Sequence, residues 1–290
     1  MASGIFVGLS TIDLIYTVDE FPAANAKAVA RTQAVLAGGP ATNAAITFSH
    51  LGGDATLVSP AGRHPLVALL KDELQGYRVE HIDLTPESDE PPAVSSVWVN
   101  GRGERSVVSL NATQIEIPTP QVDPSNLEKA RILMVDGHSM SACQAWAEAA
   151  RTRRVPVVFD GGSWKPGTER LLRSVDIAIC SADFRPPDCR DEATTIAYLR
   201  SAGVQHLAIT HGANPIRVVA GSFTGTVEVP LIEVVDTTGA GDIFHGAFCY
   251  FACGGCEFVD ALREASKVAA ESCRFHGTRG WIQTGSKPQT

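Results

Sequence analysis

The sequence has little positive charge relative to negative charge, and this excludes one class of partner. Its 290 residues include 24 Lys and Arg against 32 Asp and Glu, which gives a formal net charge of −8 at pH 7. Nucleic-acid-binding proteins gather Lys and Arg on one face to replace phosphate counterions. The densest basic run, residues 151–154, ends an apparent helix, where positive charge suits the helix dipole. We therefore expect no nucleic-acid partner.

Long apolar runs and paired cysteines are also lacking. No stretch reaches the roughly 18 uninterrupted apolar residues of a membrane-spanning helix, and the N-terminal MASGIFVGLS has no basic leader. The seven cysteines are odd in number and none stands in a CxxC pair, so a disulfide framework or a zinc site is not expected. The sequence predicts a protein of the cytoplasm without a membrane partner.

Short apolar runs alternate with helical patterns along most of the chain, which is typical of a mostly parallel sheet flanked by helices. The expected strands are 4–10, 55–62, 131–137, 155–161, 176–181 and 206–212. The expected helices are 41–52, 66–76, 140–154, 191–203, 241–254 and 258–277. We predict an α/β fold of the Rossmann-like kind that forms one domain over residues 1–290.

Two stretches break this alternation. Residues 12–36 and 93–110 both resemble antiparallel ribbons, and the second contains Asn-Gly-Arg-Gly at 100–103 between two alternating β-rich runs, a hairpin signal. The segment 85–92, TPESDEPP, is polar and rich in proline, as expected of a connector. We predict that the two ribbons form a small β-sheet lid on the α/β body.

The strongest chemical signal is the segment VVDTTGAGDIFHGAFCYF, residues 234–251, in which a β-run meets small residues and then a helical pattern. Free backbone N–H groups at a helix N-terminus, together with the helix dipole, accommodate an anion such as a phosphoryl group. Asp242 beside such a hole suits a base that takes the proton of an attacking hydroxyl. The spacing alone is equally consistent with a carboxylate that caps an ordinary β–α turn.

This segment resembles the DTxGAGD signature of the PfkB, or ribokinase-like, carbohydrate kinases. A second family signature, a glycine-rich segment ending in Asn, resembles residues 38–43, GGPATN. The resemblance spans nearly the whole chain and implies a ribokinase-like fold that phosphorylates a sugar hydroxymethyl group with ATP. It also implies Mg²⁺ carried on the nucleotide, and a homodimer formed through the lid.

The resemblance assigns roles residue by residue. Asp242 is similar to the catalytic base, with an anion hole from the backbone of Gly239, Ala240 and Gly241. Sugar hydroxyls would meet Asp13, Gly39 and Asn43. Lys27 and Asn111 stand as they do in the sulfofructose kinase branch of the family, and His138 completes the expected sugar site at the position where that branch carries Arg. The nucleotide would lie against Ser181, Thr210, Gly212 and Gly241, with residues 265–277 beside the adenine. A K⁺ ion near the anion hole would involve Asp236 and Thr238.

The sequence also departs from the family pattern. Residues 62–65, Gly-Arg-His-Pro, replace the usual G-x-D, and residues 181–184, Ser-Ala-Asp-Phe, replace the NxxE motif that organises Mg²⁺ waters. The sulfofructose kinase branch carries Arg where this chain has His138, so a sulfonated sugar is a minority alternative. The departures bear on nucleotide and metal binding more than on the reaction.

Two other functions stay open at this point. A nucleoside kinase would need rings that stack on the base, and Phe21 and Trp98 are the obvious candidates. A non-catalytic sugar- or nucleotide-binding regulator on the same fold is the other alternative. His211 and His245 stand beside the signature turns, but a single histidine on a helix face is more often a packing residue, so neither receives a catalytic role.

Overall fold

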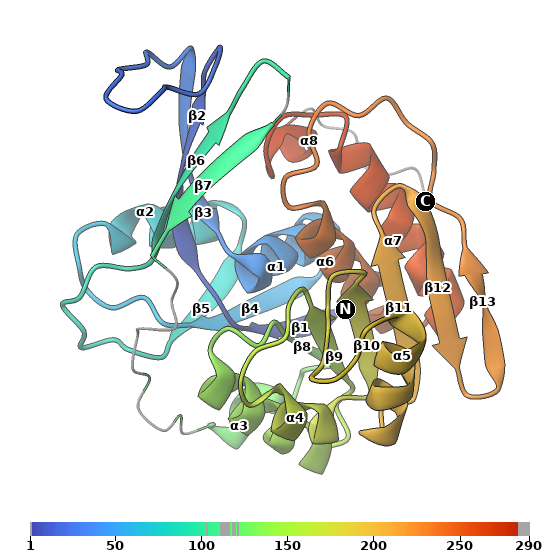
Figure 1. Cartoon of the computed structure of the whole chain (residues 1–290). Helices are drawn as coiled ribbons and strands as arrows, with labels where there is room; N and C mark the ends of the chain where they lie inside the picture. The colour runs from blue at the N-terminus through green and yellow to red at the C-terminus, as the bar shows by residue number, and fades with distance from the viewer. Residues whose placement is uncertain (1, 103, 111–116, 118–119, 121, 284–290) are drawn as a thin grey trace.

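The computed structural model describes residues 2–102, 104–110, 117, 120 and 122–283, which form two separate β-sheets with flanking helices (Figure 1). The larger sheet has nine strands in the order β13-β12-β11-β10-β9-β8-β1-β4-β5. Its strands are β1 Ser3–Val7, β4 Asp54–Ser59, β5 Val79–Asp83, β8 Ile132–Val135, β9 Val157–Gly161, β10 Ile177–Ser181, β11 His206–His211, β12 Asn214–Ala220 and β13 Phe223–Val227.

Seven of these strands, from β5 to β11 in the spatial order, run parallel. Strands β12 and β13 form an antiparallel hairpin at the edge beside β11. All six strands expected from the sequence are present in this sheet, and the predicted α/β class is confirmed. Three strands were not anticipated, namely β5, β12 and β13.

Helices cover both faces of the large sheet (Figure 1). They are α1 Pro40–His50, α2 Val67–Gly76, α3 Met140–Thr152, α4 Thr168–Leu171, α5 Glu192–Ser201, α6 Ala240–Cys253, α7 Phe258–Ser272 and α8 Gly280–Gln283. The described residues also contain the short 3₁₀ turns Pro124–Leu127 and Leu172–Ser174. The six longer helices are those expected from the periodic apolar positions.

Alternation along the strands divides the buried side chains between two cores. In β1, Phe6 points to the face covered by α1, α6 and α7, whereas Ile5 and Val7 point to the face covered by α3 and α5. Successive side chains of a strand point to opposite faces, so a fully buried parallel strand is apolar on both sides. This explains why the expected strands read as continuous apolar runs.

Helices α1 and α6 pack with unusually close backbones. A Cβ atom added at Gly246 would lie 2.3 Å from the carbonyl oxygen of Ala44 and 2.8 Å from Cβ of Thr47. No side chain fits such a gap without moving one helix, so the glycine permits the contact. The first turns of α1 and α6, which carry Asn43 and Asp242, are therefore held at a fixed separation.

The smaller sheet has four strands in the order β3-β2-β6-β7 and projects from the α/β body (Figure 1). Its strands are β2 Thr11–Thr17, β3 Thr32–Gly38, β6 Val94–Val99 and β7 Arg105–Ser109. The pairs β2–β3 and β6–β7 are antiparallel, and β2 joins β6 in parallel. In the turn between β6 and β7, the side-chain oxygen of Asn100 accepts hydrogen bonds from the N–H groups of Arg102 and Glu104, each at 3.0 Å.

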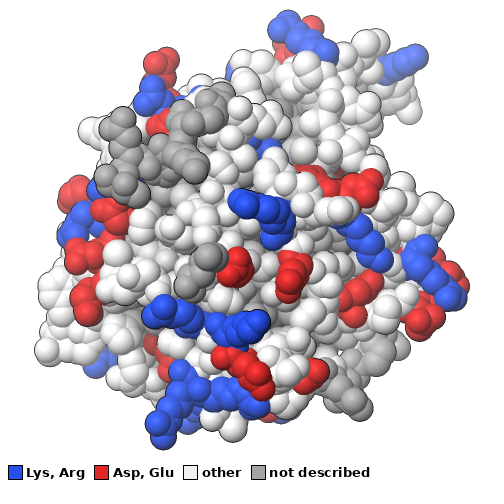
Figure 2. Space-filling model, turned by 180° about the vertical axis from the view of Figure 1, so that it is seen from behind, with Lys and Arg blue, Asp and Glu red and all other residues white. Residues whose placement is uncertain are grey.

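The surface shows mixed charge. On the face opposite that of Figure 1, basic and acidic side chains are interspersed (Figure 2). Within the described part of the chain, no helix is long and apolar enough to cross a membrane. All seven cysteines are free thiols, five of them buried.

Candidate functional site

The GAGD turn opens α6 between two pockets. Gly239 caps the helix in the left-handed conformation with φ of 69°, and a Cβ there would lie 2.4 Å from Cγ2 of Thr278. Only glycine fits this turn without strain. The Ala240 N–H donates to Thr237 O at 3.2 Å, whereas the N–H groups of Gly241 and Asp242 donate to no acceptor among the described residues. These free donors at a helix N-terminus suit an anion.

Asp242 lies in the first turn of α6 and bonds to the opposite helix. Its Oδ2 accepts a hydrogen bond from Nδ2 of Asn43 at 2.7 Å. Burial, followed by the negative charge of nearby Asp160, raises the pKa of Asp242 to about 7, although the bond from Asn43 opposes the rise. A carboxyl group with such a pKa is suited to accept a proton near neutral pH.

A buried carboxylate organises the opposite wall. Asp136, at the end of β8 and 1% exposed, accepts hydrogen bonds from the N–H groups of Leu9 at 2.8 Å, Ala41 at 3.3 Å and His138 at 2.8 Å. It thereby joins the ends of β1 and β8 to the first turn of α1. Gly39 precedes that turn with φ of 97°, and a Cβ there would lie 2.3 Å from Leu9 O.

The first pocket lies between this wall and the small sheet. It is lined by Leu9, Thr11, Asp13, Gly39, Asn43, Ser95, Val97, Arg105, Val107, Ser109, Leu110, His138, Thr238, Gly239, Asp242 and Thr278. Oδ1 of Asp13 accepts a hydrogen bond from the Thr11 hydroxyl at 2.7 Å. Burial raises the pKa of Asp13, against hydrogen bonds from Thr11 and Ser95. Nδ1 of His138 is buried and has no hydrogen-bond partner among the described residues.

Four of the six residues expected to bind a sugar line this first pocket, namely Asp13, Gly39, Asn43 and His138. Lys27 does not line it and lies exposed in the segment between β2 and β3. Asn111 lies outside the described residues. The residues predicted from the sequence therefore lie on one side of the first pocket. That side is formed by α1, β2 and the end of β8.

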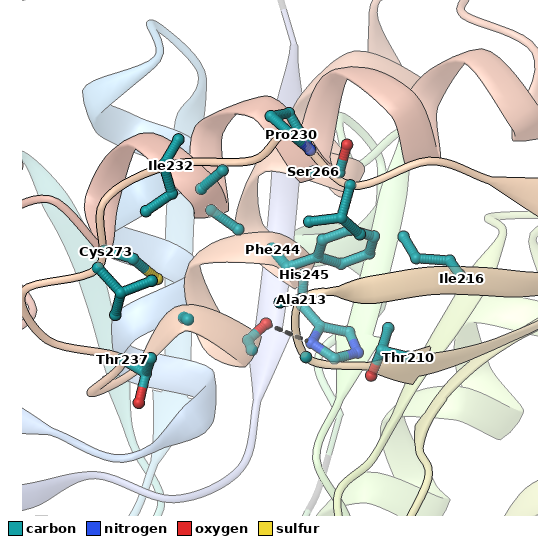
Figure 3. Close-up of a pocket in the computed structure, with 17 residues that line it drawn as sticks. Thr210, Ala213, Ile216, Pro230, Ile232, Thr237, Phe244, His245, Ser266 and Cys273 are labelled. Atoms are coloured by element: carbon teal, nitrogen blue, oxygen red, sulfur yellow. Dashed lines mark hydrogen bonds between the residues drawn. The ribbon is translucent and has the colours of Figure 1, made fainter.

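The second pocket lies on the other side of the GAGD turn and is mainly apolar (Figure 3). Ile216, Ile232 and Phe244 supply much of its wall, and Thr210 lies where β11 ends. Its remaining lining residues are Gly212, Ala213, Val229, Pro230, Val234, Thr237, Ala240, Gly241, His245, Ser266, Ala269, Ala270 and Cys273. A mainly apolar pocket that borders a helix N-terminus with free N–H groups suits a base joined to phosphates.

Of the residues expected to bind nucleotide, Thr210, Gly212 and Gly241 line this second pocket and Ser181 does not. The Ser181 hydroxyl instead accepts a hydrogen bond from the Asp183 N–H at 3.2 Å. A Cβ added at Gly241 would meet no atom within 4 Å, so that position faces open space.

The two histidines beside the turns are held by the fold. Nδ1 of His245 faces Gly241 O at 2.7 Å (Figure 3) and Nε2 faces Ile179 O at 3.2 Å. Nε2 of His211 lies 2.7 Å from Oε2 of Glu192. Both side chains thus have structural partners, and His245 additionally supports the backbone of the GAGD turn.

Asp236 and Thr238 form a compact turn of oxygen atoms next to the anion hole. Oδ1 of Asp236 accepts hydrogen bonds from the N–H of Thr238 at 2.8 Å and from its hydroxyl at 2.7 Å, and Oδ2 accepts from the Gly277 N–H at 2.8 Å. Burial alone would raise the pKa of Asp236, but these hydrogen bonds lower it. The carboxylate of Asp236 and the hydroxyl of Thr238 are hard oxygen ligands of the kind that K⁺ takes. No cluster of three or more His, Cys, Asp or Glu suited to a metal is found among the described residues.

Comparison with known proteins decides the family. A model described as pfkB family carbohydrate kinase matches residues 1–284. The chain belongs to the pfkB family of carbohydrate kinases. This PfkB-family chain is an ATP-dependent sugar kinase, as its two glycine-rich motifs predicted.

Relatives of this PfkB-family chain include several sugar kinases. The ribokinase of Bacillus subtilis is 24% identical over 289 residues, covering 96% of this chain and 95% of that protein. The ATP-dependent ribose-1-phosphate kinase of Halopiger xanaduensis is 26% identical, covering 92% of this chain and 90% of that protein. The ribokinase of Arabidopsis thaliana, solved with ribose and ATP, has a TM-score of 0.80 at 22% identity and covers 98% of each chain.

Two residues at the site of this PfkB-family chain were not predicted from the sequence. Arg105 enters the first pocket from β7, and Arg279 lies behind Asn43, although neither stands in a family motif. The alternation of β7 could have indicated Arg105, because residues 105, 107 and 109 share one face. Arg63, one of the departures, forms ion pairs with Asp89 and Glu87 at the surface and thus holds the connector 85–92.

Proposed function

We propose that this chain transfers the γ-phosphoryl group of ATP to a hydroxymethyl group of a sugar, with Asp242 as the general base. One observation carries the proposal. Asp242 lines the first pocket, while Gly241, whose N–H has no acceptor among the described residues, lines the second. A base and an anion hole thus meet at the junction of a polar and an apolar pocket.

The reaction follows from this placement. A sugar hydroxyl bound in the first pocket loses its proton to Asp242 as its oxygen attacks the γ-phosphorus, and ADP leaves through the second pocket. The N–H groups of Gly241 and Asp242, at the start of α6, stabilise the negative charge on the transferred group. Mg²⁺ would reach the site on the nucleotide phosphates and neutralise part of their charge. We propose K⁺ at Asp236 and Thr238 as support for the anion hole.

The chemistry of the first pocket favours a sugar over a nucleoside. Asp13 and Asn43 offer an acceptor and a donor for neighbouring hydroxyls. The inner face of the small sheet supplies Ser95, Val97 and Ser109, and no aromatic ring is among the described residues that line this pocket. Trp98, a stacking candidate for a nucleobase, lines a separate hollow with Tyr16 and Pro22. We propose that the small sheet closes as a lid over the sugar and excludes water.

We also propose a homodimer formed through the lid, and a cytoplasmic location that gives access to ATP. The edge strands β3 and β7 leave apolar side chains exposed, with Val35 at 40%, Val107 at 51% and Val108 at 72%. An open strand edge presents unpaired backbone groups with which a second chain can pair. Light scattering at micromolar concentration should give twice the chain mass, and a Val108→Asp variant should give the single mass.

A coupled ADP-release assay with Mg·ATP tests the function. The panel should contain ribose, ribose 1-phosphate, ketoses, sulfofructose and nucleosides, each in Na⁺ and in K⁺ buffers. We expect turnover on a sugar that falls by about 10²–10⁴-fold in Asp242→Asn, the usual loss when a general base is removed. Turnover on nucleosides alone would replace the sugar assignment, and sugar binding without transfer would favour the regulator alternative.

A further inference from the structure

Arg279 is a buried cation in the loop that leads into α8. The residue is 3% exposed, and its guanidinium is held on three sides. Nη1 donates to Oδ1 of Asn43 at 2.9 Å, Nη2 donates to Ala37 O at 2.7 Å, and Nε bonds to Oε1 of Glu73 at 2.9 Å. The last contact is an ion pair that neutralises the buried charge.

Glu73 ties this cation to the base of the small sheet. Its Oε2 accepts a hydrogen bond from the N–H of Ala37, while Arg279 donates to the carbonyl of the same residue. The penultimate residue of β3 is thus held through both of its backbone groups by one ion pair. The guanidinium carbon also lies 5.7 Å from the centre of the Tyr77 ring. The side chain of Arg279 therefore has a single well-defined position.

This position determines how the Asn43 amide is turned. A guanidinium carries only N–H donors, so the atom of Asn43 that faces Arg279 must be the oxygen. The NH₂ group then faces Asp242, and Nδ2 donates to Oδ2 at 2.7 Å. If the amide turned by 180°, its oxygen would face the carboxylate and would repel the ionised form.

We propose that Arg279 is a positioning residue, which orients the Asn43 amide so that it donates to, and thereby stabilises, the ionised form of Asp242. The proposal rests on the role of Asp242 as the base of the proposed reaction. The orientation of the Asn43 amide does not depend on bound substrate, because every contact that fixes it is made by residues of this chain.

The charges of other residues near Asp242 explain why the hydrogen bond from Asn43 is important for its ionisation. Asp160 at the end of β9 and Asp136 at the end of β8 both raise its pKa, and His245 on α6 lowers it. His138 lines the same pocket, and Arg279 stands behind Asn43. With two carboxylates nearby, the amide is one of the two groups that favour the ionised form. Without Arg279 the pKa of Asp242 should rise above about 7.

The direct test is a titration that needs no turnover. Protein labelled with carbon-13 at aspartate carboxyl groups is titrated by NMR, and the Asp242 signal is identified by its loss in Asp242→Asn. We expect Arg279→Met to raise the midpoint by about one pH unit, the scale of a hydrogen bond to a charged group. A midpoint equal to that of the unmodified protein would overturn the proposal.

Two further variants separate orientation from simple loss of charge or fold. Arg279→Met leaves Glu73 as an unpaired, partly buried charge. The double variant Glu73→Gln/Arg279→Met therefore removes both charges and keeps an acceptor for the Ala37 N–H. It should unfold cooperatively and show the same raised midpoint. In an Asn43→Ala background, Arg279→Met should add no further shift. A shift as large as in the native background would mean that Arg279 acts on Asp242 directly.

Kinetics distinguish this proposal from the proposed function. If the native protein phosphorylates a sugar, the acid limb of kcat/KM should move upward in Arg279→Met by the same amount as the NMR midpoint, with KM for ATP unchanged. Movement of KM for ATP without a change in the acid limb would contradict the positioning role. If the native protein transfers no phosphoryl group, the proposed function fails, and the NMR titration still decides the role of Arg279.

Discussion

Asn43 and Asp242 are 199 positions apart in the sequence, and their side chains are joined by a hydrogen bond of 2.7 Å. Each lies in the first turn of its helix, α1 or α6, and Gly246 lets the two helices pack with nearly touching backbones. The residue expected to hold the sugar and the residue expected to deprotonate it thus form one unit. A change in either should affect both binding and chemistry.

The pKa of Asp242 predicts a specific dependence of activity on pH. Only the ionised carboxylate accepts a proton, so kcat/KM should rise about tenfold per pH unit below pH about 7 and level off above it. Steady-state rates with saturating Mg·ATP and limiting sugar, measured from pH 5 to 9, check this. A profile that stays flat down to pH 5 would contradict the assignment of the base.

The same carboxylate should lower the stability of the fold at high pH. Its pKa is raised from 3.8 to about 7, so the folded state holds a proton that the unfolded state releases between these values. Stability is therefore lost as the pH rises through this window. Asp242→Asn, which carries no charge, should gain about 2 kcal/mol relative to the native protein between pH 5 and pH 9. Urea unfolding at both pH values measures the difference, and an equal margin at both would refute it.

Two glycines of the GAGD turn form a matched pair of variants. Gly239→Ala places a Cβ at positive φ and 2.4 Å from Thr278, and should cost about 1–3 kcal/mol of stability. The Cβ atom of Gly241→Ala would meet no protein atom within 4 Å, so the melting temperature of this variant should hardly change. Its methyl group would face the space expected for phosphates, and KM for ATP should rise by about tenfold. Equal effects of the two variants on stability would argue against this description of the turn.

Asp13 should act on the sugar and not on the nucleotide. Asp13→Ala removes an acceptor from the first pocket, and we expect kcat/KM for the sugar to fall by about 10–100-fold, the scale of a hydrogen bond to a charged group. KM for ATP should stay the same. Asp19→Ala is the control, because Asp19 is an exposed carboxylate of the same ribbon, paired with Arg31 outside the pocket. An equal loss in both variants would exclude a specific role for Asp13.

Arg63, in the segment that departs from the family's G-x-D pattern, should prove dispensable for the chemistry. Its ion pairs with Asp89 and Glu87 join exposed side chains, and ion pairs in water contribute little to stability. Arg63→Ala should therefore keep kcat and lose little stability. A large fall in kcat at unchanged melting temperature would show that this departure has a functional role.

Sequence patterns predicted the α/β body well because its strands are buried on both faces and its helices are strongly periodic. The six expected strands are all in the large sheet, whereas β5, β12 and β13 were not predicted. Apolar and polar side chains alternate less clearly in β13, which lies at an edge of the sheet and leaves Phe223 about half exposed. Weak patterns of this kind do not distinguish a strand from a loop.

The site was predictable to the extent that a motif carries it. The GAGD turn and the glycine-rich start of α1 indicated Asp242 and Asn43, which the structure brings together. Arg279 could not be found in this way, because its role depends on Glu73, 206 positions away, and on the backbone of Ala37. A contact between distant segments leaves no local pattern in the sequence. For Arg105 a local pattern exists, because residues 105, 107 and 109 share one face of β7, but the sequence does not say which face is turned to the pocket.

The small sheet is assembled from two ribbons separated along the chain by α1, β4, α2 and β5. Its central pairing, β2 with β6, joins the two ribbons in parallel. The sheet therefore forms only when segments from either side of that part of the chain come together. The small sheet therefore cannot be exchanged between relatives, to change substrate preference, as one continuous segment. Both segments must be moved together, with the β2–β6 register preserved.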